Sequence, residues 1–270
     1  MSGPGEGFRA GFAALAGRPN VGKSTLLNAL VGEKLSIVTP RPQTTRHRIL
    51  GLVNLPHAQI AFVDTPGLHH GARRALNRAM NRTAASALAD ADVVLFVVEA
   101  GRWTADDQLA LDRVIGGARP AIAVVNKMDR MRPREAALPF IAELAARHGF
   151  VDVVPCSARD THNLDRLMEC MGAQLPLSPP LFPPEQLTDR DTAFRIAEEI
   201  REKLTLELNQ EVPYGIAVAI ESMSEEDGRL AVSAVIWVDR EGQKPIVIGE
   251  GGERLKRVGR AARLALNGLL

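Results

Sequence analysis

Short apolar runs alternate with longer helical stretches over the first 175 residues. The runs are bounded by Gly, Pro, Asp or Asn and predict strands buried on both faces at 12–15, 60–63, 93–98, 121–125 and 151–154. Helices are predicted between them at 23–30, 75–88, 105–115, 134–148 and 164–175, and residues 47–55 are expected to add an antiparallel edge strand. Alternating strands and helices predict an α/β fold with a mixed, mostly parallel sheet.

A second pattern follows a proline-rich segment. Residues 176–190 contain five prolines, which favour a semi-rigid spacer over a proline-rich ligand for a partner domain. Beyond it, helical spacing over 193–208, apolar runs at 216–220 and 230–238, a short helical run at 244–248 and a helix at 253–269 predict a smaller α+β domain. We therefore expect domains at 8–175 and 191–270, joined by the linker at 176–190.

Composition narrows the class of protein. The 270 residues are 46% hydrophobic and 24% charged, which excludes a mainly disordered chain. The net charge of +1 gives no general attraction to nucleic acid or acidic membranes, so any such site must be local. Cys156 and Cys170 suggest no disulfide framework or zinc site, which favours a cytoplasmic setting. No run of about 18 apolar residues predicts a membrane span, while a peripheral contact stays open.

The segment GRPNVGKS, residues 17–24, joins a predicted strand to a predicted helix and fits the phosphate-binding P-loop. Gly17 and Gly22 let the backbone approach phosphates closely, and the helix N-terminus adds partial positive charge. Lys23 is expected to reach the outermost phosphates, and Ser24 to bind Mg²⁺ through its hydroxyl.

Two further motifs end later strands. DTPG, residues 64–67, places Asp64 where it can bind Mg²⁺ through water, and the Gly67 N–H where it can sense the terminal phosphate. NKMD, residues 126–129, offers the Asp129 carboxylate to the two N–H groups on one edge of guanine; adenine lacks this pair. Asn126 is expected to tie neighbouring loops, and the Lys127 stem to lie along the base. The backbone of Cys156-Ser157-Ala158 could contact the guanine oxygen.

These motifs, with QTTRH at 43–47, resemble those of translation-factor-related GTPases. Together with PRPQTTRHRI and the C-terminal module, they resemble the Era family of ribosome-assembly GTPases over nearly the whole chain. The resemblance implies that Thr45, or Thr44, is the switch threonine that meets Mg²⁺ and the γ-phosphate only in the GTP state. Lys23, Thr45 and Gly67 are the implied catalytic residues, and Ser24, Thr45 and Asp64 the Mg²⁺ ligands. The implied nucleotide-binding residues are Gly17, Arg18, Pro19, Asn20, Val21, Gly22, Lys23, Ser24, Thr25, Asp64, Thr65, Pro66, Gly67, Leu68, Asn126, Lys127, Met128, Asp129, Ser157 and Ala158.

Two positions bear on the rate of hydrolysis. Leu68 follows DTPG, where many GTPases have a glutamine that orients the attacking water, so slow intrinsic hydrolysis of GTP to GDP and phosphate is expected. Related GTPases with an asparagine at the position of Asn20 use K⁺ in place of an arginine finger. The resemblance therefore suggests a potassium site at Asn20; the alternative is an asparagine that stabilises the loop.

The glycine cluster at 249–252 fits the GxxG loop of KH domains, which clamps a single-stranded RNA backbone. Residues 244–263 contain six basic side chains against two acidic ones, a local patch suited to phosphates. Glu250 within the loop is expected to weaken the clamp. The candidate RNA-binding residues are Ile248, Gly249, Glu250, Gly251, Gly252, Arg254, Lys256, Arg257 and Arg260.

The resemblance implies a monomeric GTPase switch that binds the 3′ region of small-subunit ribosomal RNA and acts in maturation of the small ribosomal subunit, with some peripheral membrane association. Era-like KH modules continue past the GxxG helix, so ending at Leu270 suggests an incomplete KH domain. Two alternatives remain open: a GTPase of a tRNA-modification or other ribosomal complex, and an RNA-binding module whose nucleotide is mainly structural. We also interpret the charges at 198–203 as a solvated helix face, and Trp103 and Trp237 as packing residues.

Overall fold

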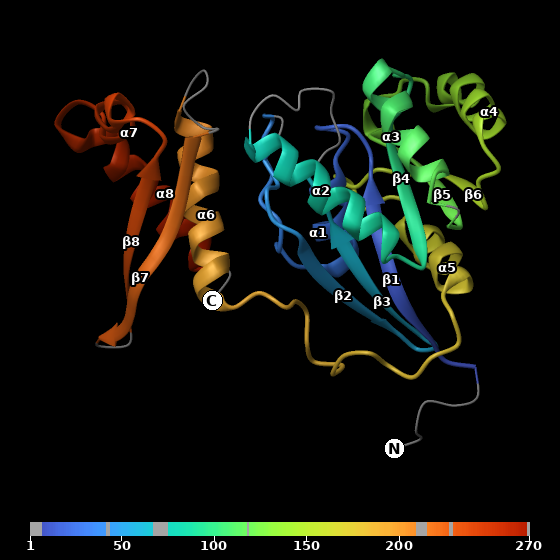
Figure 1. Ribbon diagram of the computed structural model, residues 1–270, viewed down its shortest axis with the longest axis horizontal. Coiled ribbons are helices and arrows are strands. Elements are labelled where there is room, and N and C mark those ends of the chain that lie inside the picture. Colours follow the sequence, from blue (N-terminus) through green and yellow to red (C-terminus); the bar gives the residue numbers. More distant parts are fainter. Residues whose placement is uncertain are drawn as a thin grey trace. The chain divides into compact units, whose positions relative to one another are not determined.

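The computed structural model describes residues 7–41, 44–66, 75–117, 119–208, 215–226 and 229–268 (Figure 1). Contacts divide the chain into two compact units. The first contains Met1–Ser36 and Pro40–Asp189, and the second contains Ile37–Thr39 and Arg190–Leu270. Among the described residues, no helix combines the length and the apolar character needed to cross a bilayer.

The first unit is built on a six-stranded sheet. Its strands, in spatial order, are β2 (Ile49–Leu55), β3 (Ala58–Asp64), β1 (Arg9–Ala16), β4 (Val93–Glu99), β5 (Ala121–Asn126) and β6 (Asp152–Pro155). Only β2 runs antiparallel to its neighbour. The predicted α/β fold with a mixed, mostly parallel sheet is therefore confirmed, including its antiparallel edge strand.

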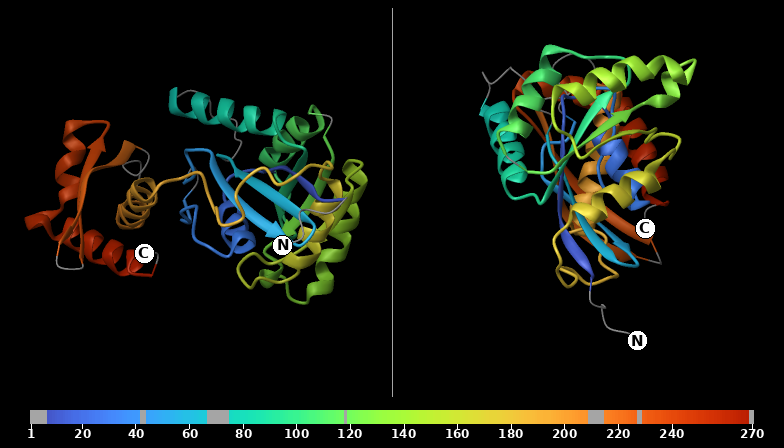
Figure 2. Two further views of the ribbon diagram at one scale, coloured as in Figure 1. Left: turned by 90° about the horizontal axis from the view of Figure 1, so that it is seen from below. Right: turned by 90° about the vertical axis from the view of Figure 1, so that its right-hand side faces the viewer.

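Helices cover both faces of this sheet. They are α1 (Lys23–Val31), α2 (Ala75–Ala89), α3 (Ala105–Ile115), α4 (Leu138–Arg147) and α5 (Leu164–Gln174). Figure 2 shows α1 and α2 on opposite faces. The prediction of one continuous helix over 134–148 was wrong, because a 3₁₀ turn at Arg134–Ala137 precedes α4. Pro139 lies in the first turn of α4 and has no N–H with which to extend a helix from the preceding turn.

Parallel strand order decides where the polar loops meet. The β1, β4 and β5 strands are neighbours with the same direction, and their buried residues are almost entirely apolar. The loops that follow them therefore leave the same edge of the sheet. Three segments that are far apart in the sequence therefore lie at this edge: residues 17–22, the segment after Glu99 and the NKMD segment.

The proline-rich segment is attached to the first unit along its length, which differs from a free spacer. Ser178 N donates to Phe8 O at 3.1 Å, and Leu52 N donates to Leu187 O at 2.9 Å. Gln59, which is buried on β3, donates to Phe182 O at 2.8 Å and accepts from Leu181 N and Phe182 N at 2.7 and 2.9 Å. Prolines that cannot continue a strand still leave carbonyl and neighbouring N–H groups that pair with it.

The second unit packs helices against a two-stranded sheet. Its elements are α6 (Thr192–Glu207), β7 (Ile216–Glu226), β8 (Arg229–Val238), a 3₁₀ turn (Glu241–Gln243), α7 (Lys244–Ile248), a 3₁₀ turn (Glu250–Gly252) and α8 (Glu253–Leu266). Leu204, Leu208, Ile216, Val247 and Val258 form its core. Strand β7 is longer than the predicted run at 216–220, because residues as far as Glu226 pair with β8 beyond a register shift between Ile220 and Ser222. Polar side chains are compatible with this exposed pair of strands, because the pairing is made by backbone hydrogen bonds.

Two interpretations of the second unit were also wrong. Glu198, Glu199, Arg201 and Glu202 are buried on α6, where solvated charges were expected. Their burial is tolerated because they are paired: Arg201 donates to both carboxylate oxygens of Glu198, at 2.7 and 2.6 Å, and Lys203 lies 2.7 Å from Glu199. Trp237 is 62% exposed on β8, whereas a packing residue was expected.

Replacing Gln59 tests the attachment of the proline-rich segment. Gln59→Ala leaves partly buried backbone groups of Leu181 and Phe182 unpaired, which should destabilise the first unit by about 3 kcal/mol and lower its Tm by roughly 6–12 °C. Limited proteolysis within 176–190 should become faster. The control Gln108→Ala, which removes an exposed bond to Asp112, should cost less than about 0.5 kcal/mol. Unchanged proteolysis and Tm in Gln59→Ala would contradict the attachment.

Candidate nucleotide-binding site and nucleic-acid interface

The loop between β1 and α1 has a path that depends on its glycines. Gly17 and Gly22 have φ values of 146° and 99°, and Asn20 lies in the left-handed region at 63°. A Cβ on Gly17 would lie 2.4 Å from Val97 O, and a Cβ on Gly22 would lie 2.4 Å from Asn126 Nδ2. Any side chain at these positions would both strain the backbone and collide with a neighbouring strand end. The P-loop sequence thus forms a tight turn into α1, with Val21 fully buried and Thr25 half-buried.

Lys23 is buried in the first turn of α1 and folds back over this loop. Its Nζ donates to Gly17 O and Arg18 O, each at 3.0 Å. Burial lowers the pKa of the Lys23 ammonium to about 8. A cation held by neutral carbonyls in this way would be stabilised by an arriving phosphate.

Hydroxyl groups gather around Asp64 at the end of β3. Ser24 Oγ and Ser36 Oγ each donate to Asp64 Oδ2 at 2.8 Å, Thr45 Oγ1 lies 3.3 Å from the same oxygen, and Ser24 Oγ and Thr45 Oγ1 are 2.8 Å apart. Burial raises the pKa of Asp64, and its Oδ1 is buried with no hydrogen-bond partner in the described part of the chain. An unpaired carboxylate oxygen near the Ser24 and Thr45 hydroxyls fits Mg²⁺, which prefers oxygen ligands and keeps several waters.

The rest of the DTPG motif is only partly described. Thr65 is buried and donates to Leu15 O at 2.9 Å, which fixes the chain after Asp64, and Pro66 follows it. Gly67 and Leu68, together with Gln43 of QTTRH, lie outside the described residues. The predictions made for them stay predictions.

Asn126 connects three loops. Its Nδ2 donates to Val21 O at 2.9 Å, and its Oδ1 accepts from Ala158 N at 3.0 Å. Lys127, in the left-handed region at φ 66°, directs its Nζ to Asn20 O at 2.6 Å. Met128 is buried beneath them. The NKMD segment is thus hydrogen-bonded to both the phosphate loop and the CSA segment, as expected for Asn126.

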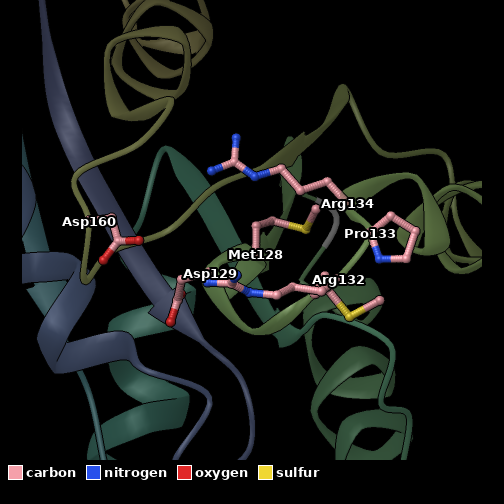
Figure 3. Close-up of a pocket in the computed structure, with 7 residues that line it drawn as sticks. Met128, Asp129, Arg132, Pro133, Arg134 and Asp160 are labelled. Carbon is pink, nitrogen blue, oxygen red and sulfur yellow. The ribbon is translucent and has the colours of Figure 1, made fainter.

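Asp129 borders a hollow of about 320 Å³ that is also lined by Met128, Met131, Arg132, Pro133, Arg134 and Asp160 (Figure 3). Ser157 Oγ donates to Asp129 Oδ1 at 2.8 Å and so orients the carboxylate. Cys156 is buried, and burial raises the pKa of its thiol to about 12, so the thiol stays protonated and unreactive. Asp129 thus presents an oriented acceptor carboxylate next to the CSA segment, which is the kind of group that recognition of guanine would need.

Three residues that support the site were not found from the sequence. Ser36 is fully buried against Asp64, and the buried Asp107 and the partly exposed Glu99 hold the Arg18 guanidinium at 3.0 and 2.9 Å. A serine in a polar loop and acids near strand and helix ends are common, so no local pattern distinguishes them. The one available signal was the position of Glu99 at the carboxyl end of a buried strand.

The glycine cluster of the second unit forms a turn between α7 and α8. Gly249, Gly251 and Gly252 have φ values of 77°, 55° and 78°, and a Cβ on Gly249 would lie 2.7 Å from Arg254 Cβ. Ile248 is 44% exposed beside the turn, and Glu250 is exposed within it. The backbone is therefore accessible here without intervening side chains.

The basic residues of α8 differ in their surroundings. Arg254 donates to Ile246 O, Lys256 lies 2.7 Å from Glu253, and Arg257 lies 3.0 Å from Glu207. Arg260 is exposed. All four lie on α8, which directly follows the glycine turn.

Lys23 gives a pH-dependent prediction for nucleotide binding. Phosphates favour the charged ammonium, so binding should raise the Lys23 pKa above its free value of about 8. Below pH 8 the Lys23 amine is protonated in both the free and the bound protein, so the affinity for GDP should not depend on this group. Above pH 8 the free amine loses its proton and binding must take one up, so the affinity should fall as the pH rises. Calorimetry in buffers of different ionisation enthalpy measures the uptake. In Lys23→Arg, which stays charged, the uptake should vanish, and its persistence would contradict the assignment.

Comparison with known proteins agrees with both units. A family model described as a 50S ribosome-binding GTPase matches residues 12–127, and a KH domain model matches residues 211–269. GTPase Era of Stenotrophomonas maltophilia (strain R551-3) is 49% identical over 259 residues, which cover 96% of this chain and 87% of the relative.

Two solved structures resemble the whole chain. A crystal structure of Era in complex with MgGDPNP and nucleotides 1506–1542 of 16S ribosomal RNA matches with a TM-score of 0.91 and 40% identity, covering 96% of this chain and 88% of that one. A crystal structure of a single-residue variant of Aquifex aeolicus Era bound to GDP.AlF4⁻ matches equally well, with a TM-score of 0.91 and 40% identity, over 96% and 89% of the two chains. The chain belongs to the Era family of GTPases and combines a GTPase domain with a KH domain.

Proposed function

We propose that this GTPase binds GTP at the carboxyl edge of its six-stranded sheet, hydrolyses it to GDP and phosphate with Mg²⁺, and binds the 3′ region of small-subunit ribosomal RNA through its KH domain. The observation that carries the proposal is the meeting of the phosphate loop, the Asp64 cluster and the NKMD segment at one edge, where Asn126 ties the NKMD segment to the phosphate loop and to the CSA segment. Membership of the Era family supports GTP hydrolysis as the reaction, and these contacts support the choice of the residues that carry it.

The protein residues act by positioning and by charge. Backbone N–H groups of residues 17–24 and the Lys23 ammonium hold the phosphates, and the Asp129 carboxylate accepts two hydrogen bonds from guanine. Ser24 and Thr45 would hold Mg²⁺ directly and Asp64 through water; the bound ion neutralises charge that develops on the transferred phosphoryl group. Because Thr45 reaches this cluster from the loop before β2, loss of the terminal phosphate would release that loop.

Hydrolysis is expected to be slow without a partner. Leu68 has no group that could orient water, so another residue or an activator must do so. Asn20 supports a potassium site: it is exposed at the mouth of the phosphate loop, and its Nδ2 donates to Pro40 O at 3.1 Å in the loop that leads to Thr45. A monovalent cation there would supply positive charge beside the phosphates.

The small subunit is favoured over the large one. The 50S-binding model matches residues 12–127 alone, whereas the Era structure that contains 16S ribosomal RNA matches 96% of the chain, and the KH domain model matches residues 211–269, which include the GxxG turn and α8. Maturation of the small subunit is the corresponding role. A cytoplasmic location is favoured by the cysteine usage as well as by the family resemblance. A monomeric state and peripheral membrane association rest on the resemblance alone.

Turnover tests the enzymatic part. Lys23→Ala should lower GTP hydrolysis ~100-fold or more, because the cation beside the phosphates is lost. Lys244→Ala, which removes an exposed lysine of the second unit, should leave it unchanged. The release of phosphate measures both, and turnover of Lys23→Ala at the rate of the unaltered chain would refute the site. Replacing KCl by NaCl in the same assay should slow turnover if K⁺ binds at Asn20.

Adding charge to the glycine turn tests the RNA part. Gly251 has a left-handed backbone that Asp and Asn tolerate, and a Cβ there meets nothing within 4 Å. Gly251→Asp should weaken binding of an RNA with the sequence of 16S nucleotides 1506–1542 by roughly tenfold, through repulsion of phosphates. Gly251→Asn, whose side chain is equal in shape but neutral, should bind the RNA with an affinity within about threefold of that of the unaltered chain. Fluorescence anisotropy measures both, and equal affinities would argue against a phosphate clamp.

A further inference from the structure

Glu99 ends the one central strand that leads into none of the five nucleotide motifs. In the sheet, β4 lies between β1, which runs into the phosphate loop, and β5, which runs into the NKMD segment. Glu99 is the register partner of Asn126. A side chain at this position is within reach of the loops on both sides.

The Glu99 carboxylate forms ion pairs with basic side chains of both loops. Its Oε2 lies 2.9 Å from Arg18 Nη2 of the phosphate loop and 3.2 Å from Lys127 Nζ of the NKMD segment. Its Oε1 lies 3.2 Å from Arg130 Nη1. The Glu99 side chain is 15% exposed and the Arg18 side chain 9%, so water screens the Arg18 pair only weakly.

Arg18 is held in a fixed direction by a second acid. Its Nε donates to Asp107 Oδ2 at 3.0 Å, and Asp107 is itself fixed at the N-terminus of α3 by hydrogen bonds from Thr104 N and Thr104 Oγ1 at 2.9 and 2.7 Å. The planar guanidinium thus spans acids from β4 and α3. Only an arginine meets both at once, which fixes the orientation of the phosphate loop at its second residue.

Lys127 is held at its tip from two directions. Its Nζ donates to Asn20 O at 2.6 Å and lies 3.2 Å from Glu99, so its stem is stretched from the NKMD segment to the phosphate loop. Burial alone would raise the pKa of Glu99, but hydrogen bonds from Arg18 and Lys127 bring it below its usual value. The carboxylate is therefore charged at neutral pH.

We propose that Glu99 is a positioning residue for guanine nucleotides, which fixes the phosphate loop through Arg18 and the base-binding segment through Lys127 in one arrangement. Preorganising the two loops lowers the ordering cost of binding a ligand that spans them. The effect falls on the affinity for phosphates and base together. We expect the Asp64 cluster to keep its arrangement, because the other groups to which Arg18 and Lys127 donate are Asp107, Pro19 O and Asn20 O, and not Ser24, Thr45 or Asp64. This inference rests on the nucleotide site proposed above.

The test is Glu99→Gln, which keeps the shape of the side chain and removes its charge. The affinities for GDP and GTP should both fall by about tenfold, mainly through faster dissociation. KM for GTP should rise accordingly, while kcat at saturating GTP changes less than about twofold, because the lost interaction acts on binding. The ratio of GDP to IDP affinity should be unchanged, since pairing of the base with Asp129 is not altered. Stopped-flow release of a fluorescent GDP analogue gives the rates.

Controls separate this role from a general contribution to folding. Glu143→Gln makes the same change in an exposed ion pair with Arg147 on α4 and should leave dissociation unchanged. Arg18→Lys, which cannot span Glu99 and Asp107 together, should accelerate dissociation as Glu99→Gln does, and serves if Glu99→Gln does not fold. Glu99→Asp should give an intermediate rate.

The outcomes are distinct. If the unaltered chain fails to bind GDP, the proposed nucleotide site itself is wrong. If it binds and Glu99→Gln and Arg18→Lys release GDP at its rate, the positioning role is overturned. A fall in Tm of the nucleotide-free protein without faster release, or a changed ratio of GDP to IDP affinity, would likewise overturn it.

Discussion

The close approach of Gly22 to Asn126 is the constraint on which the nucleotide site depends. With no side chain on Gly22, the Asn126 amide reaches Val21 O with one end and Ala158 N with the other. Three loops from distant parts of the sequence are thereby fixed to one another by a single side chain. Any Cβ at residue 22 would push the phosphate loop away from Asn126 at the end of β5.

The polar groups at this edge are arranged for a ligand more than for stability. Lys23 is buried against neutral carbonyls, and Asp64 has a buried oxygen with no partner in the described ranges. Each arrangement costs free energy in the protein alone, and each is relieved by an anion or a cation of the right kind. Sites that bind charge by preorganised groups commonly carry such a cost. The apolar strands beneath supply the stability that offsets it.

The antiparallel edge of the sheet is protected by the proline-rich segment. Exposed edge strands invite pairing with other chains. Here Leu52 of β2 pairs with Leu187, and Gln59 of the neighbouring β3 binds Leu181 and Phe182. The proline-rich segment covers this edge, and its prolines prevent it from becoming a strand that could itself recruit another.

The apolar runs by themselves predicted the sheet and most of its helices, and the five motifs predicted the candidate nucleotide-site residues. Both signals depend on neighbours in sequence: a run of apolar residues marks a buried strand, and a glycine permits a loop conformation that other residues rarely adopt. Long-range pairing escaped that reasoning. The hydrogen bonds of Gln59 to the proline-rich segment and the contacts of Ser36 with Asp64 and of Glu99 with Arg18 join residues whose own surroundings in sequence are ordinary. Only the tertiary structure decides them, because a charged or polar side chain is buried when folding brings its partner within hydrogen-bond reach, and that partner lies elsewhere in the chain.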